Sequence, residues 1–179
     1  MWLWPAGILL VVTISLGWRA AANRPRAWAA GEAPLAFWHW RNETPSAALV
    51  AQAARQTNAR VLFLRAGQFD DEGGGNLRRI RPAVGRVPDA LPLHLTYNAT
   101  RTLLASFERI EETELASLFA ETYRTDAARA ASDGARVVGA QLDLDVPTRL
   151  LPRYTRVLRH ARKQLPPDTQ LSITGLPTW

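Results

Sequence analysis

Apolar segments of strand length recur along the chain from about residue 32 onward. Between them lie stretches in which apolar residues return every three or four positions, the period of an amphipathic helix. Strands that alternate with helices predict an α/β fold with a parallel sheet. The expected strands, about five in number, are 35–40, 61–65, 91–98, 137–146 and 171–176.

Three helices are expected between these strands. Thr44 before Pro45 is typical of a helix start, and the acidic residues of 111–114 favour another. Thr148 can cap the third helix, whose arginines at 153, 156 and 162 are expected to face solvent. Between 65 and 91 the glycines and prolines predict a loop. The apolar stripe expected on the third helix is Leu151, Tyr154, Leu158, Ala161 and Leu165.

The segment 137–146 has two chemically different faces. In a strand, alternate residues share a face, so Gln141, Asp143 and Asp145 lie together, opposite a row of apolar residues. A strand buried between helices on both sides should be apolar on both faces, whereas a barrel strand turns one face to the lumen. The pattern therefore predicts a partial (β/α)8 barrel. Two further strands show the same division, one through His94, Thr96 and Asn98 and the other through Ser172 and Thr174.

The length of the chain limits how much of such a barrel it can form. A closed barrel of eight strands typically needs about 250 residues. Beyond residue 30 about 150 residues remain. We therefore expect residues 31–179 to form an incomplete barrel, the front half of a longer one if the chain continues. If the chain ends at residue 179, the segment 171–176 is expected to be an open edge that needs a protein partner or a second copy.

Residues 1–30 are expected to form a hydrophobic helix that serves as a signal peptide or membrane anchor. An uncharged apolar run extends from Trp2 to Trp18 and is followed by Arg19. The alternative is a buried core helix, but the tryptophans that bracket the run are typical of a membrane interface. This segment predicts a location in the cell envelope, either periplasmic or anchored to the inner membrane.

Composition removes several classes of function. The chain has no cysteine, which excludes a disulfide framework, a cysteine-ligated zinc site and a thiol nucleophile. Its formal charge of +6 comes from arginine rather than lysine and falls to +3 without the first thirty residues. Nucleic-acid binding is therefore not expected. No motif indicates a cofactor, and two neighbouring carboxylates are too few to predict a metal site.

Asp143 and Asp145 are the candidate catalytic residues. Alternate residues of one strand lie roughly 6 to 7 Å apart at the backbone, so mutual repulsion should raise one pKa. A protonated acid beside an ionised partner is the arrangement that hydrolyses glycosidic bonds. Asp145 is the expected acid or base because it lies nearer the barrel mouth, with Asp143 as its electrostatic partner. The alternative is a structural role, in which both pair with Arg65, Arg101 or Arg149.

Aromatic and polar residues at the strand ends are candidates for binding a sugar. Flat rings stack against sugar faces, whereas Trp38 is expected to pack in the core. His94 lies on the polar face and could act as an acid or base. The expected substrate-binding residues are Gln141, Trp40, His94, Tyr97, Asn98 and Trp179.

Three segments, 37–41, 139–148 and 171–179, resemble an uncharacterised bacterial family, the domain of unknown function 3142. The resemblance implies a barrel akin to glycoside hydrolases, of which this chain from about residue 33 would be the N-terminal half. The middle segment also resembles the fourth-strand signature of chitinase-type hydrolases. However, Ala140 and Pro147 stand where that signature has its first acid and its catalytic glutamate, so chitinase chemistry is not implied.

The sequence thus predicts an exported, glycoside-hydrolase-like domain with a carbohydrate pocket around Asp143 and Asp145. Whether it is an enzyme stays open at this point. The alternatives are a noncatalytic module that binds a saccharide or the cell envelope, or an inactive fragment. The expected partners are a carbohydrate and, if the first segment is retained, the membrane.

Overall fold

The computed structural model describes residues 35–83 and 85–175. The expected signal or anchor segment, 1–30, therefore lies outside the described residues. Within them, no helix is both long and apolar enough to cross a membrane. The elements are β1 (Ala36–His39), α2 (Ala47–Thr57), β2 (Val61–Asp71), β3 (Leu77–Ile80), β4 (Leu93–Ala99), α3 (Arg101–Ser106), α4 (Glu112–Ser132), β5 (Val137–Asp143), the 3₁₀ turn η1 (Thr148–Leu150), α5 (Leu151–Gln164) and β6 (Gln170–Ser172).

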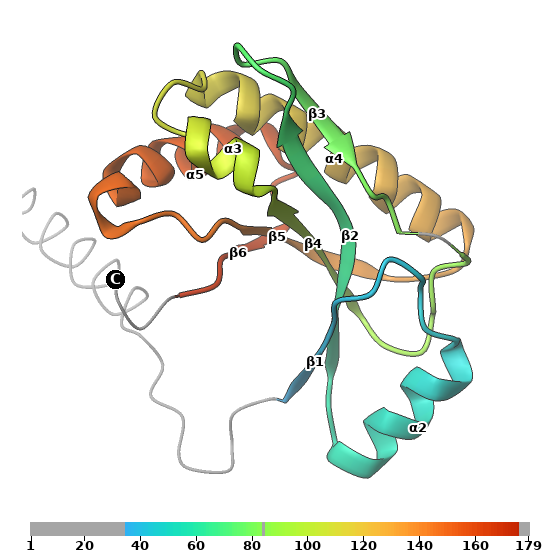
Figure 1. Cartoon of the computed structure of the whole chain (residues 1–179). Helices are drawn as coiled ribbons and strands as arrows, with labels where there is room; N and C mark the ends of the chain where they lie inside the picture. The colour runs from blue at the N-terminus through green and yellow to red at the C-terminus, as the bar shows by residue number, and fades with distance from the viewer. Residues whose placement is uncertain (1–34, 84, 176–179) are drawn as a thin grey trace, which may run out of the picture. The chain divides into compact units, whose positions relative to one another are not determined.

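The strands form one mainly parallel sheet, which confirms the α/β class (Figure 1). Their spatial order, β1-β2-β4-β5-β6, follows the order of the chain, and each neighbouring pair is parallel. β3 alone is antiparallel and pairs with the end of β2. The sheet is thus wound in a single direction, with no reversal of strand order such as doubly wound folds show.

The apolar face of the sheet forms the core together with α3, α4 and α5. α4 and α5 lie side by side behind the sheet, and α2 lies apart from them (Figure 1). Because the side chains of a strand alternate, every second residue enters this core. The strand residues buried there include Leu62, Leu64, Leu93, Leu95, Tyr97, Ala140 and Leu142, and the helices add Leu103, Phe107, Leu115, Phe119, Tyr154 and Val157.

The opposite face of the sheet curls so that its two edges approach each other. Trp38 of edge strand β1 lines the same hollow of about 330 Å³ as Ile173 and Thr174, which follow edge strand β6. Neighbouring strands stand about 4.8 Å apart, so the edges of a flat sheet of this width could not share a hollow that small. No pairing joins β1 to β6 among the described residues, and a closed barrel is not shown.

The chain between 61 and 91 contains a hairpin, where the sequence predicted a short strand and a loop. β2 continues to Asp71 past an irregularity between Arg65 and Gly67, and then turns into β3. The turn uses Gly73, Gly74 and Gly75, all at positive φ, which glycine adopts without strain. The irregularity interrupts the alternation of side chains, and this hid the second half of the strand.

Helix starts differ in detail from those expected. Ser46, not Thr44, caps α2, because its hydroxyl accepts the amide of Leu49, while Thr44 donates to the carbonyl of Arg86. α3 was not predicted. Its cap is Thr100, whose hydroxyl accepts the amide of Leu103 at 3.1 Å.

Two of the three arginines expected to face solvent on α5 instead hold loops in place. Arg153 donates to the carbonyls of Phe107 and Ile110 and pairs with Glu112. Arg162 donates to the backbone carbonyls of Thr169, Leu165 and Pro166. Carbonyls at helix and loop ends have no partner within their own element, so an arginine that reaches them stabilises the junction. Arg156 is half exposed and pairs with Glu112.

A buried polar network joins the hairpin to the core. The hydroxyl of Tyr97, which has no exposed surface, donates to Asp126 Oδ2 at 2.9 Å. Arg79 of β3 pairs with the same oxygen at 2.7 Å and donates to the carbonyl of Ala66 at 2.7 Å. Asp126 is 4% exposed, so these two partners replace the water that would otherwise solvate its carboxylate.

We expect Asp126→Ala to lower the free energy of unfolding by about 3–5 kcal/mol, because it leaves the Arg79 guanidinium without its buried counter-charge. Urea denaturation measures this change. The control is Glu108→Ala, which removes an ion pair to Arg149 whose side chains are 54% and 66% exposed, and which should cost less than about 1 kcal/mol. Equal effects of the two substitutions would contradict the assignment.

Candidate functional site

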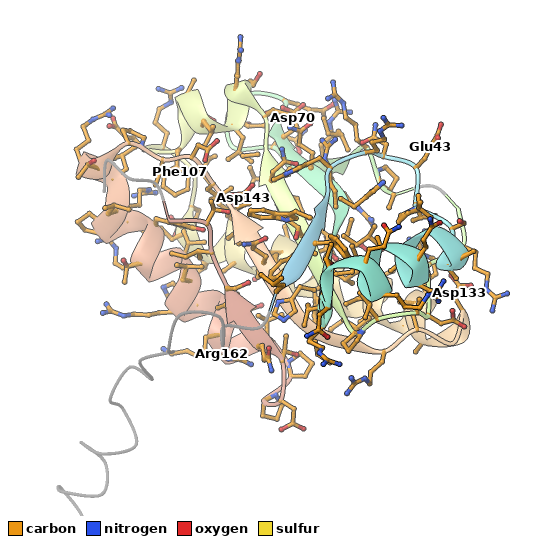
Figure 2. The ribbon with its side chains drawn as sticks, turned by 90° about the horizontal axis from the view of Figure 1, so that it is seen from below. Glu43, Asp70, Phe107, Asp133, Asp143 and Arg162 are labelled. Atoms are coloured by element: carbon orange, nitrogen blue, oxygen red, sulfur yellow. The ribbon has the colours of Figure 1, made fainter. Side chains whose placement is uncertain are left out.

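The candidate site is a pocket of about 350 Å³ at the carboxyl ends of β4 and β5. Asn98 and Asp143 are register partners at these ends, so the parallel pairing places their side chains next to each other. Figure 2 shows Asp143 near the middle of the molecule, whereas Glu43 and Asp133 lie at its periphery. The pocket is lined by Trp38, Trp40, Asn98, Ala99, Leu104, Asp143, Asp145 and Thr174.

Asp143 is the buried acid of the pocket. It is the last residue of β5 and only 9% exposed, and its Oδ1 has no hydrogen-bond partner among the described residues. Burial raises the pKa of Asp143, the hydroxyl of Thr174 opposes this in part, and the charge of Asp145 adds to it. A carboxyl group in these surroundings keeps its proton to a higher pH than a free one and can donate it.

Asp145 lies at the rim of the same pocket. It follows β5 and is exposed, while its neighbours Leu144 and Val146 are each only 1% exposed and hold the segment against the core. The sequence predicted Asp145 as the acid and Asp143 as its partner. The structure gives the raised pKa to Asp143, because that side chain is the one taken out of water.

The ion pairs expected under the structural alternative are not found between described residues. Arg65 donates to Asn98 and Asn42, and Arg149 pairs with Glu108. Neither Asp143 nor Asp145 takes part in an ion pair in the part of the chain that the structure describes. A partly buried carboxylate with no cation beside it is costly for stability, which favours a role in binding or chemistry.

Two of the residues that line the pocket are tryptophans, which form an aromatic wall. The rings of Trp38 and Trp40 lie 5.0 Å apart at an angle of 35°, and Trp38 also contacts Phe63 edge to face at 5.6 Å. The two side chains are 41% and 44% exposed. The expectation that Trp38 packs in the core is therefore wrong, because it lies on an edge strand at the open face of the sheet.

Gln141 lies deeper on the same face. It is 4% exposed and its Oε1 accepts a hydrogen bond from Thr96 at 3.1 Å. It lines the neighbouring hollow of about 330 Å³ rather than the pocket of the two acids. Trp38 and Thr174 line both hollows, so the two are adjacent.

His94 lies still further from the carboxyl ends. It pairs in register with Gly139, four residues before Asp143, and its ring lies 4.6 Å from that of Phe63 at an angle of 36°. Its Nε2 lies 3.1 Å from Gln170 Oε1. Burial lowers the pKa of His94, and a Cβ on Gly139 would collide with its ring. These contacts are those of a packed side chain, and the structure does not bring His94 to the pocket.

Tyr97 and Trp179, the other two predicted ring residues, are not seen at the site. Tyr97 lies on the opposite face of β4, in the core, stacked on Phe69 at 5.5 Å. Trp179 lies outside the described residues. Of the predicted site residues, the structure brings together Asp143, Asp145, Trp40 and Asn98.

Besides Trp38, sequence reasoning missed three residues that line the pocket. Leu104 comes from α3, which was not predicted, and Ala99 ends β4 without any chemical signal. Thr174 did carry a signal, because it alternates with Ile173 as polar residues do on the other strands. No group of three or more potential metal ligands occurs in the described parts of the chain.

The fold and site together define an α/β domain with an acidic and aromatic pocket at the carboxyl edge of a parallel sheet. A family model described as a domain of unknown function (DUF3142) matches residues 101–179. This match confirms the resemblance for α3 to the end of the chain, including Asp143, Asp145 and Thr174. Trp38, Trp40 and Asn98 precede it. No curated protein and no solved structure matches the chain significantly.

We expect Asp143→Asn to make the protein more stable at neutral pH. In the unfolded chain this carboxyl ionises near its ordinary pKa of 3.8, but in the folded protein it ionises only at higher pH. Between these values the folded state binds more protons, so the free energy of unfolding falls as pH rises. The variant has no carboxyl group at this position, so its free energy of unfolding does not fall for this reason. Its advantage should be near zero below pH 3.8 and greatest above the folded pKa.

Thermal or urea unfolding of both proteins from pH 3.5 to 8 measures this difference. Glu121→Gln, on the exposed side of α4, is the matched control, because it removes a solvated carboxylate. If the curves for the parent and Asp143→Asn run parallel across this range, the carboxyl of Asp143 is not perturbed by folding.

Proposed function

We propose that this chain is a carbohydrate-active domain, related in architecture to the glycoside hydrolases, which binds a sugar between the Trp38–Trp40 wall and the two acids. The observation that carries the proposal is the pocket of about 350 Å³ that gathers both tryptophans, Asn98, Asp143 and Asp145. Apolar ring faces bind the C–H faces of a pyranose, while carboxyl and amide groups bind its hydroxyls.

The winding of the sheet supports a barrel-like architecture. The strands follow chain order in one direction, and β1 shares two hollows with the segment after β6. In (β/α)8 enzymes the catalytic residues lie at the carboxyl ends of the strands. Asp143 ends β5 and Asn98 is its register partner near the end of β4, which is the position such a site requires.

Hydrolysis of a glycosidic bond requires a proton for the leaving oxygen and a second carboxylate for water or for the anomeric carbon. Asp143 suits the first role because burial raises its pKa. Asp145 suits the second, since it lies exposed at the rim, where solvent reaches it. Trp40 and Trp38 would hold the sugar over both groups. The apolar run within residues 1–30 supports export to the cell envelope, where the domain would have access to extracellular glycans.

A noncatalytic saccharide-binding module is the second candidate. The observation that favours it is the tilted pair Trp38–Trp40, whose rings are about two-fifths exposed and need no acid to bind a glycan. Both functions use the same pocket. They differ in whether Asp143 and Asp145 are needed for turnover or only for contact.

If the domain is a hydrolase, Asp143→Asn and Asp145→Asn should each lower the rate of hydrolysis by about 100-fold or more. A panel of aryl glycosides and polysaccharides measures this rate. Binding on a glycan array should persist in both variants, because an amide keeps the shape and much of the hydrogen bonding. Trp40→Ala should weaken binding by about tenfold, while Leu49→Ala, an exposed apolar side chain on α2, should not.

Turnover in the parent protein that both asparagine variants retain would contradict the catalytic roles. Binding without turnover in the parent, lost in Trp40→Ala, would favour the module. A full-length protein that neither binds nor cleaves any glycan would overturn both candidates. Because Asp143→Asn is expected to be the more stable protein, its loss of activity could not be attributed to unfolding.

A further inference from the structure

Arg65 is a charged side chain that has no role in the proposed function. It lies on the pocket side of β2, because its neighbours Leu64 and Ala66 are buried in the core on the other side. Its Nε donates to Asn98 Oδ1 at 3.3 Å. Its Nη1 donates to Asn42 Oδ1 at 2.8 Å and to the carbonyl of Trp40 at 3.4 Å. Asn98 and Trp40 both line the pocket of the two acids.

Every one of these partners is neutral. Most of the other half-buried or paired arginines have a carboxylate, as Arg79 has Asp126 and Arg153 has Glu112. Arg65 has none in the part of the chain that the structure describes, and its Nη2 makes no hydrogen bond there. A guanidinium presents its donors as a planar fork, and the free nitrogen leaves an edge of that fork available to a ligand.

A second cation, Arg81, follows β3 at the point where that strand pairs with β2, because Ile80 is the register partner of Gln68, three residues after Arg65. Burial lowers the pKa of Arg65, and the charge of Arg81 lowers it further. Arg81 is exposed, and its backbone has a positive φ of 48°, which is uncommon outside glycine and asparagine. Two neighbouring cations without a counter-charge repel each other, and an anion placed between them would remove that cost.

We infer that the saccharide bound here carries an anionic group, a carboxylate or a sulfate, and that Arg65 binds this group with the help of Arg81. This inference rests on the proposed function. The neutral ring would lie on Trp38 and Trp40, with its anionic substituent on the Arg65 side of Trp40 and its glycosidic oxygen on the side of Asp143. The partly buried carboxyl of Asp143, when protonated, adds no repulsion to such a ligand.

The test is a glycan array probed with the full-length protein. The array pairs neutral oligosaccharides with the same backbones carrying uronic acid groups, and separately with sulfated ones. We expect the acidic members to bind and their affinity to fall as sodium chloride is added. Arg65→Gln should weaken that binding by about tenfold or more, and Arg81→Gln by a smaller factor.

Arg159→Gln, which removes the same charge from the exposed face of α5, is the matched control and should bind like the parent. Preference for neutral glycans, or acidic binding that both Arg65→Gln and Arg81→Gln leave unchanged, would overturn the inference while the proposed function stands. No binding to any glycan would overturn both. If Arg65→Gln does not fold, Arg81→Gln decides, because that side chain is exposed and unpaired with any acid in the described residues.

Discussion

The alternation of side chains along the central strands is the constraint on which the structure depends. On β4 and β5 one row of residues, including Leu95, Tyr97 and Leu142, is almost wholly removed from water against α4 and α5. Burial of this row in the core also fixes the direction in which the alternate residues point. Thr96, Gln141, Asn98 and Asp143 must then face the curled side of the sheet. A shift of one residue would bury Asp143 in the core and expose Tyr97, so the pocket is a direct consequence of how the core is built.

Charge placement distinguishes the two faces further. On the core side, the carboxylate of Asp126 has both Tyr97 and Arg79, and Arg153 of α5 has Glu112 and two backbone carbonyls. On the pocket face of the sheet, Asp143 and Arg65 have no partner of opposite charge among the residues described. Charged groups that lack a counter-charge on one face of a sheet, while those on the other face form ion pairs, are typical of a site that a ligand completes.

Sequence reasoning predicted the α/β class, five of the strands and the pocket-facing residues Asp143, Asp145, Trp40 and Asn98, because all of these depend on periodicity and strand ends. It failed where the period breaks. The irregularity after Arg65 hid the hairpin, and α3, only six residues long, has no stripe to detect. The sequence also did not predict how deeply each side chain is buried. Periodicity assigns Asp143 and Asp145 to one face but does not show that Asp143 is buried and Asp145 is at the rim.

The position of Trp38 shows why part of the site has no local signal at all. On β1 its ring contacts those of Trp40 and Phe63, and from periodicity alone such a residue is expected to pack in the core. Its exposure arises because β1 is an edge strand, and its place in the pocket arises because the sheet curls until β1 approaches Thr174, more than a hundred residues later in the chain. The signal for this part of the site is therefore distributed over segments that lie far apart in the chain, and no local pattern contains it.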